Sequence, residues 1–163
     1  MSCRSFYRSL VRMFSVGVLA SLLALPVSAR QGKDEMAPAI KTALEAKDYR
    51  VEVTFMTPMK GRSRALTSSY YLAVRNDSIF SCLPYVGEAY SVPYGGGKGL
   101  VFDAPIERYE AEPGKKGRME IQIKTRNEED SYLYRLTVQP NGSVSVNVQP
   151  TRRQPISFSG RME

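Results

Sequence analysis

The chain has 163 residues, a formal net charge of +7, two cysteines and no histidine. Without histidine, it lacks the most common general base, the most common metal ligand and every Ser-His or Cys-His nucleophile pair. Among the familiar catalytic arrangements, this leaves mainly paired carboxylates.

Residues 1–29 have the layout of a secretory signal peptide. Three arginines without an acidic residue precede an apolar run over 14–25, and small residues at 28 and 29 mark the predicted cleavage position. The run is too short to span a bilayer. We therefore expect cleavage after Ala29 and export through the general secretory route, to the periplasm or the outside of the cell. Because Arg30 and not a cysteine follows, we expect a soluble protein rather than a lipoprotein.

Residues 30–163 are long enough for a single domain with its own core and no transmembrane segment. This part keeps one cysteine, Cys82, which lies in an apolar run and is expected to be a buried, unreactive thiol. A lone thiol excludes an internal disulfide and a thiolate zinc site. Basic residues gather in loop-like stretches such as 60–64 and Arg152-Arg153. We interpret these clusters as solvated turns and expect no nucleic-acid partner.

The spacing of apolar residues divides the chain into one helix and a series of strands. From Met36 to Leu44 they recur at helical spacing, which predicts a helix over about 35–47 with Asp34 as its cap and Pro38 in its first turn. From residue 48 the spacing changes to two, which is typical of half-buried strands. The alternation predicts eight strands, near 50–56, 69–75, 78–83, 99–104, 118–125, 131–139, 143–149 and 155–159.

Short turns between these strands, including the hairpin signal Asn141-Gly142, favour an antiparallel up-and-down meander. The predicted fold is mainly β, a small barrel of about eight strands with one N-terminal helix that can plug an end. A two-sheet β sandwich is the second choice. Large residues are expected to face inward and leave little empty space: Phe55, Phe102, Phe158, Tyr70, Tyr132 and Tyr134.

The stretch 81–102, SCLPYVGEAYSVPYGGGKGLVF, is rich in tyrosine, proline and glycine. Its Gly97-Lys98 pair does not make a phosphate-binding loop, because Gly99 follows instead of serine or threonine and no helix begins there. Acidic residues lie in turns or on wet strand faces, and only Glu88 and Asp103 flank the glycine-rich stretch. We therefore expect no enzyme, no cofactor and no metal site.

The segments LPYVGEAY at 83–90, PYGG at 93–96 and GLVF at 99–102 resemble the family known as domain of unknown function 4251. The similarity covers nearly the whole mature chain, including LTSSYYL at 66–72, Asn141-Gly142 and ISFSG at 156–160. The chain departs from the family pattern at Glu88, where members often carry a basic residue, and at 151–155. The resemblance implies a lipocalin-like antiparallel barrel in a small secreted protein of Gram-negative anaerobes. It implies no activity, substrate or catalytic residue.

Two interpretations of the tyrosine-rich stretch stay open. In the first, the tyrosines pack on the helix or seal a barrel end, with their hydroxyls bonded to loop backbone. In the second, they line the mouth of a pocket for a ligand. The candidate ligand-binding residues are Tyr85, Gly87, Glu88, Tyr90, Tyr94, Gly95, Gly96 and Tyr109.

The expected function is a non-catalytic binding module of unknown specificity that holds a small apolar or amphipathic ligand at a barrel end. The alternative is a protein-interaction or envelope-assembly module, with an envelope protein as its partner. That alternative has a filled barrel and acts through its surface, so the filling of the interior separates the two.

Overall fold

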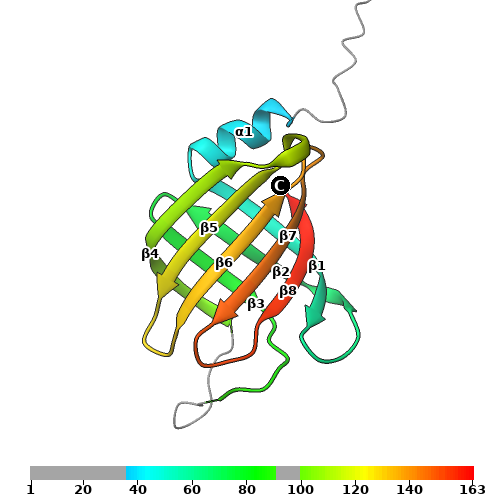
Figure 1. Ribbon diagram of the computed structural model, residues 1–163, viewed down its shortest axis with the longest axis vertical. Coiled ribbons are helices and arrows are strands. Elements are labelled where there is room, and N and C mark those ends of the chain that lie inside the picture. Colours follow the sequence, from blue (N-terminus) through cyan, green and yellow to red (C-terminus); the bar gives the residue numbers. More distant parts are fainter. Residues whose placement is uncertain (1–35, 91–99) are drawn as a thin grey trace, which may run out of the picture. The chain divides into compact units, whose positions relative to one another are not determined.

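The computed structural model describes residues 36–90 and 100–163, which form a closed antiparallel barrel with one helix (Figure 1). The predicted signal peptide lies outside these residues. No helix within the two described ranges is long and apolar enough to cross a membrane.

The strands follow one another around the barrel in sequence order, and the last strand pairs with the first. The predicted eight-stranded meander with a helix near its start is therefore confirmed. The elements are α1 (Pro38–Glu45), β1 (Asp48–Pro58), β2 (Arg64–Arg75), β3 (Ser78–Leu83), β4 (Leu100–Pro113), the short 3-10 turn η1 (Lys115–Gly117), β5 (Met119–Arg126), β6 (Ser131–Val138), β7 (Ser143–Pro150) and β8 (Ile156–Met162).

The interior of the barrel is filled by the protein's own side chains. Tyr132, Tyr134 and Phe158 are each at most 1% exposed and lie among branched aliphatic residues from every strand. The Tyr134 hydroxyl donates to Ser81 Oγ at 3.1 Å, and Ser81 Oγ donates to the Leu100 carbonyl at 2.7 Å. Burial raises the pKa of the Tyr134 hydroxyl far above its ordinary value. The predicted inward placement is thus confirmed for Tyr132, Tyr134 and Phe158, whereas Tyr70 and Phe102 are only partly buried against the core.

Phe55 was predicted to face inward, and this prediction is wrong. The β1–β2 ladder pairs Val53 with Tyr70 but Phe55 with Ala65, so a bulge interrupts the alternation between Val53 and Phe55. Phe55 is consequently 51% exposed, and Met56 takes the buried position. One extra residue in the alternation is enough to move a side chain to the other face of a strand.

Strand β4 changes its partner halfway along its length. Its first half (100–105) pairs with β3, and its second half (106–113) pairs with β5. The sequence predicted a strand over about 99–104, so the continuation of β4 to Pro113 was not predicted. Each half of β4 therefore has a neighbouring strand on one side only.

Helix α1 lies at the end of the barrel that carries the β4–β5 and β6–β7 connections (Figure 1). Pro38 occupies the first turn as predicted, but Ala37 and not Asp34 is the N-cap residue, and no side chain caps the helix. The junction between α1 and β1 lies beside Tyr109 in the second half of β4, and a hollow of ≈ 350 Å³ remains between α1 and the end of that strand, at Ala111 and Pro113. Lys47 contributes a carbonyl that accepts from Asn76 N–H at 2.9 Å, and its ammonium lies 5.2 Å from the centre of the Tyr109 ring.

Candidate functional site

The opposite end of the barrel, which we call the loop end, is formed by segments 84–90, 127–130 and 151–155 (Figure 1). Tyr85 anchors the first of them. Its hydroxyl lies 3.1 Å from the Gln154 carbonyl oxygen and 3.2 Å from the Glu88 carbonyl oxygen. Burial raises the pKa of Tyr85, and the bond to Gln154 acts against this rise. A Cβ on Gly87 would lie 2.7 Å from the Tyr85 hydroxyl oxygen, so any larger residue there would push the Tyr85 side chain from this position.

Segment 84–90 is held against segment 151–155 by backbone and side-chain bonds. Gln154 N–H donates to the Glu88 carbonyl at 3.1 Å, and Tyr90 N–H donates to the Arg152 carbonyl at 2.8 Å. The Glu88 carboxylate accepts from Gln154 Nε2 at 2.7 Å, and its two oxygens lie 3.3 and 3.4 Å from Lys60 Nζ. Glu88 therefore ties three connections together and has its oxygens engaged by neighbours.

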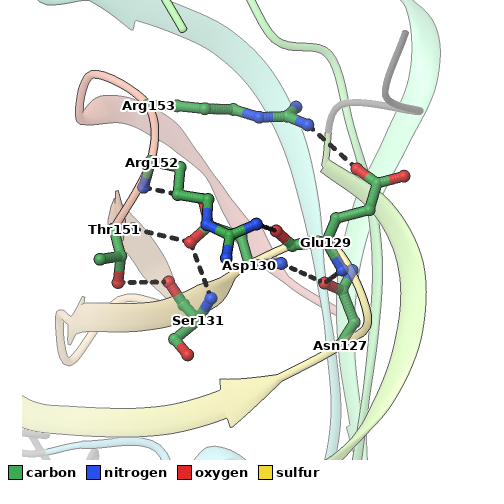
Figure 2. Close-up of polar contacts among 7 residues, drawn as sticks. All are labelled: Asn127, Glu129, Asp130, Ser131, Thr151, Arg152 and Arg153. Atoms are coloured by element: carbon green, nitrogen blue, oxygen red, sulfur yellow. Dashed lines mark hydrogen bonds and ion pairs between the residues drawn. The ribbon is translucent and has the colours of Figure 1, made fainter. Parts of the chain in front are cut away.

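Asp130 joins the β5–β6 turn to the β7–β8 connection (Figure 2). Its carboxylate is buried and accepts three backbone N–H groups, from Ser131 at 2.8 Å, Thr151 at 3.2 Å and Arg152 at 3.0 Å. Asn127 Oδ1 accepts the N–H groups of residues 129 and 130 and closes the turn. The turn is thus fixed by side-chain oxygens rather than by apolar packing.

Arg153 completes this network from the other side. Its guanidinium donates to the Glu129 carboxylate at 3.0 Å (Figure 2), and it lies over the Tyr85 ring at 5.6 Å from the ring centre. Arg153 is 6% exposed, so the prediction that Arg152 and Arg153 form a solvated pair is wrong for Arg153. The buried cation has both a carboxylate and an aromatic face as partners, which offsets its loss of hydration.

A hollow of ≈ 700 Å³ lies beside this network, between the first half of β4 and the β5–β6 turn. We call it the β4 groove. Phe102 in its wall stacks on the buried Tyr132 behind it, and the two ring centres are 4.6 Å apart. The groove is lined by Tyr71, Phe80, Ser81, Cys82, Val101, Phe102, Asp103, Ala104, Pro105, Arg126, Asn127, Glu128 and Glu129.

Cys82 was expected to be buried and is instead half-buried, on the outer face of β3 in the lining of the groove. The alternation explains this placement, because Ser81 and Leu83 face the interior and residue 82 must face outward. Asp103, one of the two acidic residues singled out from the sequence, is exposed in the same lining.

The structure brings only part of the predicted site together. Tyr85, Gly87, Glu88 and Tyr90 share the loop end, and the Tyr90 side chain is 68% exposed. Tyr109 lies in the second half of β4, where its hydroxyl donates to Tyr49 at 3.5 Å, at the helix end. Tyr94, Gly95 and Gly96 fall outside the described residues.

Sequence reasoning anticipated the bonds of the Tyr85 hydroxyl to loop backbone but missed two other residues that brace the loop end, Asp130 and Arg153. Asp130 had a signal, because Asn127 and Asp130 frame a short turn, where such side chains bond to nearby backbone N–H groups. Arg153 had none, since its partners Glu129 and Tyr85 are far away in sequence. Within residues 36–90 and 100–163, no group of three acidic or cysteine side chains is arranged to hold a metal ion.

Comparisons with known proteins address the family and the fold. A family model described as "Domain of unknown function (DUF4251)" matches residues 31–162. The crystal structure of a DUF4251 family protein from Bacteroides eggerthii DSM 20697 is similar, with a TM-score of 0.58 and 17% sequence identity, and the match covers 75% of this chain and 83% of that one. A search of curated proteins finds no match.

Proposed function

Because this chain belongs to the DUF4251 family, whose description names no activity, we propose a function from the site itself. The domain is an exported, non-catalytic binding module that takes its partner on the outer wall of the barrel, in the β4 groove. It thereby resembles the second of the two functions expected from the sequence, the module that acts through its surface.

The filled interior is the observation that carries this proposal. A barrel that carries a ligand inside needs free volume, but here Tyr132, Tyr134 and Phe158 occupy the centre at 0–1% exposure. The β4 groove lies in the wall and has ≈ 700 Å³, which is within the usual range of about 300–1,000 Å³ for binding pockets. The groove therefore offers space that the packed centre of the barrel does not.

The bonds of the loop end support this proposal further. Asp130 and Asn127 hold the β5–β6 turn that forms one side of the groove, and Arg153 holds Glu129. A rim that is already ordered loses little conformational freedom when a partner binds. In this view Tyr85 and Glu88 act as braces of the loop end and do not contact the partner directly.

Two exposed apolar residues provide a matched test. Val101 lies in the groove and is 47% exposed, whereas Phe55 lies on β1 outside the groove and is 51% exposed. The neutral apolar dye Nile red is titrated into the protein and into the variants Val101→Glu and Phe55→Glu. We expect the dye's fluorescence increase to fall at least fivefold in Val101→Glu and to change little in Phe55→Glu.

Thermal melts of both variants confirm that each is folded before the titration is read. If the dye does not bind, or if both variants weaken it equally, the β4 groove is not a binding surface and the proposal fails. If the dye binds but neither variant affects it, its site is elsewhere, and the proposal fails in the same way.

A further inference from the structure

The backbone of β4 exposes hydrogen-bonding groups toward the groove. Successive residues of a strand direct their N–H and C=O groups to opposite sides. Ile106 N–H donates to the Asp77 carbonyl on the β3 side, and the Pro105 carbonyl accepts from Thr125 Oγ1 on the β5 side. The register of β3 with β4 is unbroken over 100–105, so Val101 and Asp103 share the direction of Pro105.

No strand within the described chain pairs with these groups. The β4–β5 ladder begins only at Ile106, which pairs with Thr125, and β5 turns away at Arg126. With respect to residues 36–90 and 100–163, the N–H and C=O groups of Val101 and Asp103 therefore form an open strand edge along the groove. Pro105 agrees with this arrangement, because its missing N–H lies on the unpaired side of the strand.

Building on the proposed function, we propose that the partner in the β4 groove is an extended peptide segment that adds to the sheet beside residues 101–103. The unpaired N–H and C=O groups of a strand edge are spaced to form main-chain hydrogen bonds with another extended chain. Main-chain hydrogen bonds to Val101 and Asp103 hold the segment, and the groove receives its side chains.

The side chains along the edge specify the partner further. Val101 and Asp103 both lie on the outer face, so the partner residues opposite them also lie there, two positions apart. Asp103 and Glu128 form no ion pair with a described residue, and Arg126 is the one cation among the described residues that line the groove. The fitting segment therefore carries an apolar residue opposite Val101 and a lysine or arginine opposite Asp103.

A synthetic peptide can test this inference directly. The sequence acetyl-Thr-Lys-Thr-Val-Thr-Lys-Thr-amide reads the same in both directions, so a lysine meets Asp103 whenever the valine meets Val101, in parallel or antiparallel pairing. The peptide is titrated into the ¹⁵N-labelled domain and followed by NMR. We expect shift changes at residues 100–105 and 126–129, and none at the matched exposed site around Phe55.

Two variants separate backbone recognition from side-chain recognition. Val101→Pro removes the N–H at the open edge, and Val101→Thr keeps the N–H and the branched shape. We expect peptide affinity to fall at least fivefold in Val101→Pro and to change less than twofold in Val101→Thr. Equal losses in the two variants would overturn strand addition and leave a groove that recognises side chains.

If Val101→Pro does not fold, N-methylation of the peptide backbone tests in its place whether main-chain hydrogen bonds hold the peptide. Seven peptides, each N-methylated at one position, should alternate between lost and retained binding, because only every second N–H faces β4. Uniform loss or uniform retention contradicts the inference. If Nile red binds in the groove but the peptide does not bind, strand addition is overturned and the proposed function stands. If neither the dye nor the peptide binds, the proposed function and strand addition are both overturned.

Discussion

The second half of β4 (106–113) and its first half (100–105) each lack a strand on one side, and the second half is the more covered side, since the hollow between it and α1 has ≈ 350 Å³ against ≈ 700 Å³ beside the first half. The α1–β1 junction lies beside the second half, with Tyr49 and Tyr109 in contact and Lys47 over the Tyr109 ring. Beside the first half lies the β4 groove. The comparison teaches that the stagger of this barrel leaves two strand edges unpaired, and that the chain narrows the space beside one of them with its own α1–β1 segment.

The largest effect should come from breaking the covered side. Leu44 of α1 is 3% exposed and belongs to the core, so Leu44→Ala should cost about 2–5 kcal/mol of unfolding free energy. Chemical denaturation measures this change. The control is Thr42→Ala, an exposed position of the same helix, which should change stability by less than about 0.5 kcal/mol. Equal effects would mean that the helix does not stabilise the barrel.

The loop end should respond to the loss of a polar brace. Asp130→Ala removes the acceptor of three backbone N–H groups and should cost about 2–3 kcal/mol, because bonds to a charged group are strong and their donors lose their partners. Glu128→Ala, in the same turn but exposed, serves as the control and should be nearly neutral. If the two variants unfold at the same denaturant concentration, Asp130 is not the brace that its contacts indicate.

Alkaline pH should weaken the covered side through Tyr49. Burial, together with the neighbouring Tyr109 hydroxyl, raises the pKa of Tyr49 well above the ordinary value of 10.0. The folded state therefore retains this proton while the unfolded chain releases it, so stability is full below pH 10 and falls as the pH rises toward the folded pKa. At pH 11 the contribution of Tyr49 is a loss of about 1 kcal/mol. Urea unfolding at pH 8 and pH 11 should show a smaller loss in Tyr49→Phe than in the parent, and an unchanged loss contradicts this assignment.

The smallest effect is expected at the open edge. Val101→Thr should change the unfolding free energy by less than about 0.5 kcal/mol, because the side chain is 47% exposed. The same substitution at Val53, which is 2% exposed, buries a hydroxyl without an obvious acceptor and should cost about 1–3 kcal/mol. A large loss at Val101 would show that the groove is more tightly packed than its exposure indicates.

Much of the fold could be predicted because a strand with one buried face has apolar and polar residues in alternation, and this alternation is visible in the sequence. In β6 and β7, the inward residues from Tyr132 to Val138 and from Val144 to Val148 alternate without interruption, and the expected faces are confirmed. Asn141-Gly142 marked the hairpin between them, and Gly142 adopts the positive φ of 82° that this turn requires. Local chemistry determined these features, so the sequence revealed them.

Features that depend on distant partners could not be predicted in this way. The bulge that exposes Phe55 exists because Thr54 lies opposite residues 66–69 of β2, a mismatch visible only in the paired strands. The extension of β4 beyond Pro105 depends on which side of the strand is unpaired. The candidate site was the least predictable part of the molecule, because Arg153 contacts Glu129 and Tyr85 only after the barrel has formed.

The pairing of β1 with β8 has a kinetic consequence for this chain. This seam joins the beginning and the end of the domain, as in the bond from Thr54 to the Ser159 carbonyl across 105 positions, and it is tight enough that a Cβ on Gly160 would lie 1.9 Å from the Glu52 carbonyl oxygen. Contacts between such distant residues slow folding, because a long loop must close before they form. Until β8 pairs with it, β1 has an unpaired edge on which other chains can aggregate. The pairing of β8 therefore both closes the barrel and removes this edge.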